Sequence, residues 1–164
     1  MQTIPPYTHA DILVKSPDAE YLILVEVKTK DTQRTVNEAI TSLKREMTSF
    51  SCSLGLLVAG ERVILLRDSL AEYNGTSIYI VGEARLPKNF LPSADPQWQE
   101  HEGLEFESRV QNWLESLKLK SNFDKLPEDL KKLLSEPIIY LLNWGEISAA
   151  GYRWSKAAKL IPKH

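Results

Sequence analysis

Two short apolar runs with a turn between them constrain the fold of this chain more than any other feature. Residues 10–14 read Ala-Asp-Ile-Leu-Val and residues 21–25 read Tyr-Leu-Ile-Leu-Val. The segment between them, Ser-Pro-Asp-Ala-Glu at residues 16–20, is rich in residues that favour turns. Apolar runs of this length bounded by turn residues are typical of β-strands. The pattern therefore predicts a β-hairpin with its loop at residues 17–20.

Charged residues lie at the open end of this hairpin. Asp11 begins the first strand, and Glu26-Val27-Lys28 ends the second. Strand side chains alternate between the two faces of a sheet, so Glu26 and Lys28 share one face while Val27 points into the core on the other. The predicted loop also sets the pairing of the two strands. The expected pairs are Ser16 with Tyr21, Leu13 with Leu24, Asp11 with Glu26 and His9 with Lys28.

This register brings two carboxylates together. Directly opposed residues hold their Cβ atoms about 4.5–5.5 Å apart, where like charges are destabilising. A divalent cation between Asp11 and Glu26 would remove the repulsion. Mg²⁺ suits this role because one or two carboxylates, with water and substrate phosphates, commonly hold it. The alternative is a charged strand end that faces solvent, in which Lys28 and Glu26 only screen each other.

An acid, a variable gap and Glu-x-Lys on the following strand resemble the signature of the PD-(D/E)xK (restriction-endonuclease-like) nuclease superfamily. The resemblance implies an α/β fold with a restriction-endonuclease-like core, a central mixed β-sheet flanked by helices. It also implies metal-dependent hydrolysis of phosphodiester bonds in DNA or RNA. The expected partner is therefore nucleic acid, DNA in the first place, and a homodimer is left open.

The resemblance assigns roles to the residues that match the signature. Asp11, Glu26 and Lys28 would be the catalytic residues. Asp11, Glu26 and the backbone carbonyl of Val27 would bind Mg²⁺ or Mn²⁺, and Lys28 would position or activate the attacking water. These roles are chemically reasonable, because a metal lowers the pKa of bound water and an ammonium group stabilises negative charge that develops on the phosphoryl oxygens.

The chain departs from the family at its beginning. The family core starts with a helix that often carries another acid, whereas only residues 1–10 precede Asp11, and Pro5 and Pro6 disfavour a helix there. A later helix is the candidate replacement. Its candidate acids are Glu102, Glu105 and Glu107. Without a replacement, the expectation is a catalytically inactive domain that serves as a nucleic-acid-binding or protein-assembly module.

The segments that follow the hairpin occur in the order that the resemblance implies. A helix is predicted from Gln33 to Ser49, with Asp31 or Thr32 as its N-cap. Strands are predicted at residues 54–59, 62–66 and 77–81. The first of these is continuously apolar, which indicates burial on both faces and hence helices on both sides of the sheet.

The start of the predicted helix lies close in sequence to Lys28. Free N–H groups in the first turn of a helix favour anions. Gln33 and Arg34 in that turn, and Lys30 just before it, are therefore candidate phosphate contacts.

Prolines divide the chain into three parts. We expect an endonuclease-like α/β core at residues 1–86, a Pro-containing linker at 87–102 and a helical C-terminal extension at 103–164 that packs on the core. Within the extension, helices are predicted at residues 103–119 and after Pro127, and a loop up to residue 126.

The last stretch, residues 151–164, combines basic residues with aromatic ones and contains no acid. Such a composition suits contacts with a nucleic-acid strand. A solvated tail, or a helix whose Trp154 packs into the core, is the simpler expectation.

Composition sets outer bounds on the function. The 164 residues, 43% of them hydrophobic, suit one compact domain with an appendage. The net charge of −2 gives no general attraction to nucleic acid, so binding would need a local basic patch. The single cysteine, Cys52, and the absence of a leader-like N-terminus favour the cytoplasm. No apolar run approaches the roughly 20 residues that span a bilayer, so no membrane partner is expected.

Overall fold

The structure, a computed structural model, describes residues 9–160. The stretch with Pro5 and Pro6 and the last four residues of the basic C-terminal stretch lie outside the described residues. The strands are β1 (Ile12–Lys15), β2 (Tyr21–Lys28), β3 (Leu54–Ala59), β4 (Arg62–Asp68), β5 (Ile78–Arg85) and β6 (Glu146–Ala149). The helices are α1 (Gln33–Ser49), the 3-10 helix η1 (Pro96–Trp98), α2 (Glu102–Ser116), α3 (Lys120–Asp124), α4 (Glu128–Leu133), α5 (Ile138–Trp144) and α6 (Gly151–Leu160).

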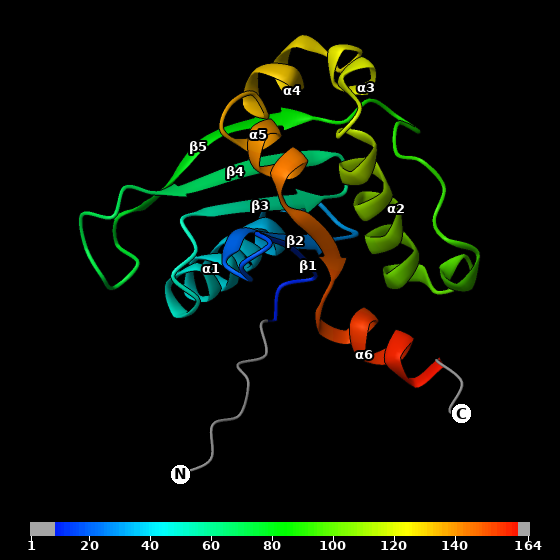
Figure 1. Cartoon of the computed structure of the whole chain (residues 1–164), viewed down its shortest axis with the longest axis horizontal. Helices are drawn as coiled ribbons and strands as arrows, with labels where there is room; N and C mark the ends of the chain where they lie inside the picture. The colour runs from blue at the N-terminus through cyan, green and yellow to red at the C-terminus, as the bar shows by residue number, and fades with distance from the viewer. Residues whose placement is uncertain (1–8, 161–164) are drawn as a thin grey trace.

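The described strands form a mixed six-stranded sheet in the order β5-β4-β3-β2-β1-β6 (Figure 1). β2 and β3 run parallel, because α1 connects them as a crossover, and the other neighbours are antiparallel. The coarse expectation of an α/β fold with a mixed sheet flanked by helices is confirmed.

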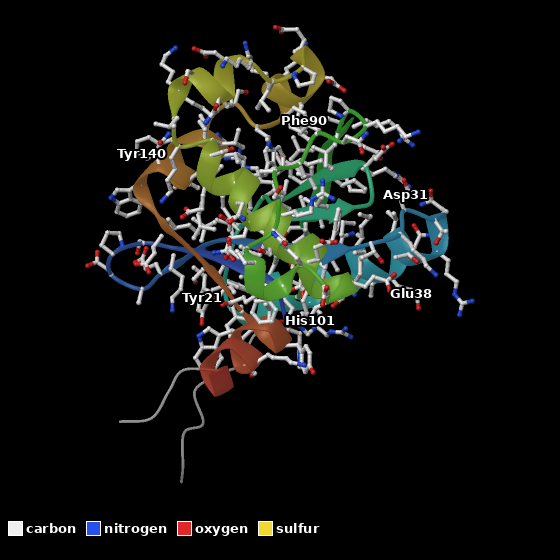
Figure 2. All side chains as sticks on the ribbon, turned by 90° about the vertical axis from the view of Figure 1, so that its right-hand side faces the viewer. Tyr21, Asp31, Glu38, Phe90, His101 and Tyr140 are labelled. Atoms are coloured by element: carbon white, nitrogen blue, oxygen red, sulfur yellow. The ribbon has the colours of Figure 1, made fainter. Side chains whose placement is uncertain are left out.

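Helices cover both faces of the sheet. α1 packs on one face through Val36, Ala39, Leu43 and Met47. α2, α4 and α5 pack on the other face, where the largest hydrophobic core lies. Figure 2, turned by 90°, shows α1, which carries Glu38, and α5, which carries Tyr140, on opposite sides of the molecule. Every residue of β3 is buried, as its continuous apolar sequence predicts.

The hairpin forms, but its ladder runs only from the pair Ile12–Val25 to the pair Lys15–Tyr21, so the expected pairs of Asp11 with Glu26 and of His9 with Lys28 lie outside it. Leu13 pairs with Leu24 as predicted, but Tyr21 pairs with Lys15 and not with Ser16, because the register shifts between Val14 and Lys15. Ser16 belongs to the loop: its N–H donates to the Glu20 carbonyl (2.9 Å) and its hydroxyl accepts from the Glu20 N–H (3.0 Å). These local bonds compete with the strand ladder and take Ser16 out of it.

Helix α1 has the bounds that the sequence predicts. Its N-cap is Thr32, the second of the two candidates, and the Thr32 hydroxyl accepts a hydrogen bond of 3.3 Å from the Thr35 N–H. The cap satisfies one of the N–H groups that a helix start leaves free. Because α1 begins just past β2, it fixes the segment that follows Lys28.

The C-terminal third differs from the expected succession of helices. The segment predicted as a loop before Pro127 contains the short helix α3. More importantly, β6 extends the sheet by pairing antiparallel with β1, with Ile12 opposite Ala149 and Lys15 opposite Glu146. β6 was not predicted. Across residues 9–160, none of the helices combines the length and apolar character needed to cross a bilayer.

Candidate functional site

Asp11 is held at the start of β1 by the backbone of β2. Its N–H donates to the Val25 carbonyl (2.9 Å), and its Oδ2 accepts a hydrogen bond of 2.7 Å from the Val27 N–H. The carboxylate is therefore fixed beside the Glu-Val-Lys triplet. Burial raises the pKa of Asp11, while the Val27 N–H and the positive charges of Lys28 and Arg153 act in the opposite direction.

Glu26 lies buried on the face of the sheet that α1 covers. Burial raises its pKa to about 7, and the negative charge of Asp11 adds to the effect. Lys28 and a hydrogen bond from Ser42 of α1 lower the pKa, and Glu46 raises it. Val27 is buried in the core on the opposite face, as the strand alternation predicts. The structure thus brings the charges of Asp11 and Glu26 close enough to influence each other.

Lys28 is the exposed member of the triplet. Its charge lowers the pKa of Asp11, Glu26 and Glu107. An exposed ammonium next to carboxylates is in a position to meet a substrate phosphate while it offsets part of their negative charge.

A further acid enters the site from α2. Burial and the charge of Asp11 raise the pKa of Glu107 to about 8, although Arg153 and Lys28 act in the opposite direction. Its Oε1 is buried without a hydrogen-bond partner in the part of the chain that the structure describes. Glu102, in contrast, is exposed in the first turn of α2. Of the candidate replacement acids, Glu107 is the one that interacts with Asp11.

Arg153 is the charged residue of the site that sequence reasoning missed. Only 2% of its surface is exposed, and its Nη2 donates to Oε1 of Gln111 on α2. Burial lowers its pKa, whereas the charges of Glu107, Asp95 and Asp11 raise it. Its Nε has no hydrogen-bond partner among the described residues. The expectation that Trp154 packs into the core is wrong, since Trp154 is exposed and the neighbouring Arg153 is buried.

The start of α6 explains how Arg153 reaches the acids. The Ala150 N–H donates to the Asp11 carbonyl (2.9 Å), so α6 begins directly beside Asp11. Gly151 has φ +59°, and a Cβ there would lie 3.1 Å from the Ala10 carbonyl oxygen. Glycine is the residue that adopts this left-handed conformation at no steric cost. No pattern in the sequence predicts the hydrogen bond between Ala150 and Asp11, because it joins residues from the two ends of the described chain.

The candidate phosphate contacts lie on the surface at the start of α1. The Gln33 amide nitrogen donates to Asn37 Oδ1 (2.8 Å), and Arg34 forms an ion pair with Glu38 (3.7 Å). Lys30 is exposed. These side chains are exposed, and the contacts that hold the acids involve none of them.

The donor set suits a hard cation. Asp11, Glu26 and Glu107 offer carboxylate oxygens, and burial is the main cause of their raised pKa values, which Lys28 opposes at all three. Within residues 9–160, no three His, Cys, Asp or Glu side chains come together closely enough to hold a metal ion by themselves. A site with two carboxylates completed by backbone oxygen, water and phosphate is the arrangement that Mg²⁺ accepts.

Comparison of this chain with protein-family models, with curated proteins and with solved structures finds no match.

Proposed function

We propose that the protein is a metal-dependent nuclease that hydrolyses phosphodiester bonds of nucleic acid, DNA in the first place. Asp11, Glu26 and the Val27 carbonyl would hold Mg²⁺ or Mn²⁺, and Lys28 would orient or activate the attacking water. One observation carries the proposal: carboxylates from the start of β1, the end of β2 and the middle of α2 gather near Lys28, and the charge of Asp11 raises the pKa of both Glu26 and Glu107. Perturbed acids gathered from several elements are typical of functional sites.

The topology supports a restriction-endonuclease-like core. The antiparallel pair β1-β2 is followed by the crossover helix α1 and the parallel strand β3, the succession that the family resemblance implies. We assign the role of the family's first helix to α2, which brings Glu107 to Asp11. The same proposal includes a cytoplasmic location, expected from the single cysteine, Cys52.

The residues divide the chemistry between them. The Val27 N–H fixes one oxygen of Asp11, which orients the carboxylate before any ligand arrives. Glu26, with a pKa of about 7, can take up or release a proton near neutral pH. The bound metal would lower the pKa of water and stabilise charge on the phosphoryl oxygens. The Lys28 ammonium would add positive charge at the solvent side of the site.

A second candidate function is a non-catalytic module that binds nucleic acid or a protein partner. The observation that favours it is Arg153, a buried guanidinium whose charge opposes those of Glu107 and Asp11 without any metal. In this version the acids and Arg153 stabilise the fold, and the site performs no chemistry.

Cleavage assays separate the two functions. Supercoiled plasmid, single-stranded DNA and RNA are incubated with the protein in Mg²⁺, in Mn²⁺ and in EDTA. Lys28→Ala is compared with Lys88→Ala, which removes an exposed lysine outside the site. The nuclease proposal expects metal-dependent cutting that Lys28→Ala abolishes and Lys88→Ala preserves. Absence of cutting in both metals, or equal cutting by both variants, would contradict it.

A further inference from the structure

Helix α6 exposes two aromatic side chains next to the candidate site. Tyr152 is 66% exposed and Trp154 is 52% exposed, while Arg153 between them is buried. Singly exposed aromatic side chains are common on protein surfaces and indicate no function by themselves. This pair is distinguished by its place, since α6 begins at Asp11 and also carries Lys156 beside the Tyr152 ring.

Helix geometry defines the surface that these rings flank. Successive helical residues are turned by about 100°, so with Arg153 pointing inward, Tyr152 and Trp154 lie on the two flanks of α6 and Ser155 points outward between them. Ser155 is exposed, and its small side chain leaves room above the helix. The ammonium of Lys156 lies 5.7 Å from the centre of the Tyr152 ring. We call Tyr152, Trp154, Ser155 and Lys156 the α6 surface.

The charge of α6 indicates what kind of ligand it suits. Its sequence, Gly-Tyr-Arg-Trp-Ser-Lys-Ala-Ala-Lys-Leu, contains basic residues and no acid, although the whole chain has a net charge of −2. Arg153 is buried, and its charge faces Glu107, Asp95 and Asp11, so within the described side chains of α6 the cation at the surface is Lys156, which favours an anionic ligand. A polyanion with flat, stackable groups is a nucleic-acid strand with unpaired bases.

The α6 surface is also connected to the acids. The helix starts at the hydrogen bond between Ala150 and Asp11, and its Arg153 interacts electrostatically with Glu107 and Asp11. A strand lying across Tyr152 and Trp154 would therefore pass close to the candidate site.

We propose that the α6 surface binds unpaired nucleotides of DNA or RNA by stacking their bases on Tyr152 and Trp154, with Lys156 near the phosphates. The inference rests on the proposed nuclease function, for which it names the substrate class: strands with single-stranded segments. Base stacking on aromatic residues tolerates any sequence, because every base has a π-face.

The test measures binding without cleavage. Fluorescence anisotropy follows a labelled oligonucleotide of about 12 unpaired nucleotides, long enough for such a surface, in EDTA. DNA and RNA versions, a blunt duplex and anionic lipid vesicles form separate arms. The double variant Tyr152→Ala/Trp154→Ala is compared with Tyr140→Ala/Trp144→Ala on α5. The control pair has similar exposure, 63% for Tyr140 and 47% for Trp144, and lies on another helix.

The proposal expects the α6 variant to bind unpaired DNA or RNA at least about tenfold more weakly than the wild type, the effect of losing one or more stacked bases. The α5 variant should bind like the wild type. Trp154→Phe together with Tyr152→Phe should retain most of the affinity, since both rings remain. Far-ultraviolet circular dichroism checks that every variant is folded.

Three results would overturn the proposal: no binding of unpaired strands by the wild type, equal losses in the α6 and α5 variants, or a loss confined to lipid vesicles. The binding assay does not depend on cleavage, because EDTA removes the metal that the proposed nuclease requires. Ring-dependent binding without cleavage would contradict the nuclease and leave the α6 surface in place, whereas cleavage that ignores both rings would contradict the α6 surface alone.

Discussion

The Val27 N–H donates a hydrogen bond of 2.7 Å to Oδ2 of Asp11. This bond connects the acid before β1 to the middle residue of the Glu-Val-Lys triplet on β2. It fixes the first carboxylate of the candidate site in the absence of any ligand, and it makes Asp11 part of the fold as well as part of the chemistry. The two roles can be separated by choosing the substitution.

Asp11→Asn is expected to keep the fold and lose the activity. The Asn side-chain oxygen can still accept from Val27, so the free energy of unfolding should stay within about 1 kcal/mol of the wild type. Asp11→Ala leaves the Val27 N–H unsatisfied and should destabilise by roughly 1–3 kcal/mol. Urea denaturation measures both values, and metal-dependent cleavage is assayed beside it. Full activity in Asp11→Asn would show that the charge of this residue has no catalytic role.

Glu26→Gln should stabilise the protein at alkaline pH and not at acidic pH. The pKa of Glu26 is about 7 in the folded protein and close to its ordinary value of 4.5 in the unfolded chain. The native state therefore binds more protons between these values, and wild-type stability falls as the pH rises through that window. The gain from Glu26→Gln should be on the order of 3 kcal/mol at pH 8 and close to zero at pH 4. Urea denaturation in EDTA across this range measures it, and a pH-independent difference would contradict the assignment.

Arg153 and Glu107 should be energetically coupled. Arg153→Met removes the positive charge that contributes most to stabilising ionised Glu107 in its buried position. The free energy of unfolding should therefore fall by on the order of 2–4 kcal/mol at pH 9. Adding Glu107→Gln should recover part of that loss, because the uncompensated charge is removed. A double-mutant cycle measured by urea denaturation gives the coupling. Strictly additive effects of the two substitutions would mean that the residues do not interact.

Gly151→Ala should loosen α6 from Asp11. The positive φ and the nearby Ala10 carbonyl oxygen both oppose a Cβ at this position, and the expected destabilisation is roughly 1–2 kcal/mol. Gly103→Ala is the matched control, since a Cβ there meets nothing within 4 Å and alanine favours the helix. Hydrogen exchange of the Ala150 amide, which bonds to Asp11, reports the loosening directly. Equal protection of that amide in both variants would contradict the role of Gly151.

Local patterns predicted much of the fold. The hairpin, the whole of α1 and the buried strand β3 each follow from a few consecutive residues whose spacing or composition matches one element. β6 was missed because it has only four residues, of which only Ile147 is buried, so its sequence carries no clear strand pattern. Its pairing with β1 depends on contacts between distant parts of the chain.

The part of the site that lies within one local element was predicted, and the part that depends on distant contacts was not. Asp11, Glu26 and Lys28 belong to one hairpin, and the sequence register brings them together. Glu107 could be named only as one of three candidate acids on a later helix, since the packing of α2 decides which of them reaches Asp11. The burial of Arg153 between two exposed aromatic residues reverses the usual preference of each residue type, so composition indicates the opposite arrangement.

The central claim is that Asp11 and Glu26 hold a divalent cation. Crystals of the wild type and of Asp11→Asn grown with MnCl₂ test it most directly, through the anomalous scattering of manganese. The account predicts an anomalous peak between the Asp11 and Glu26 carboxylates in the wild type and its loss in Asp11→Asn. A wild-type site without manganese, in which Arg153 alone faces the acids, would contradict the account.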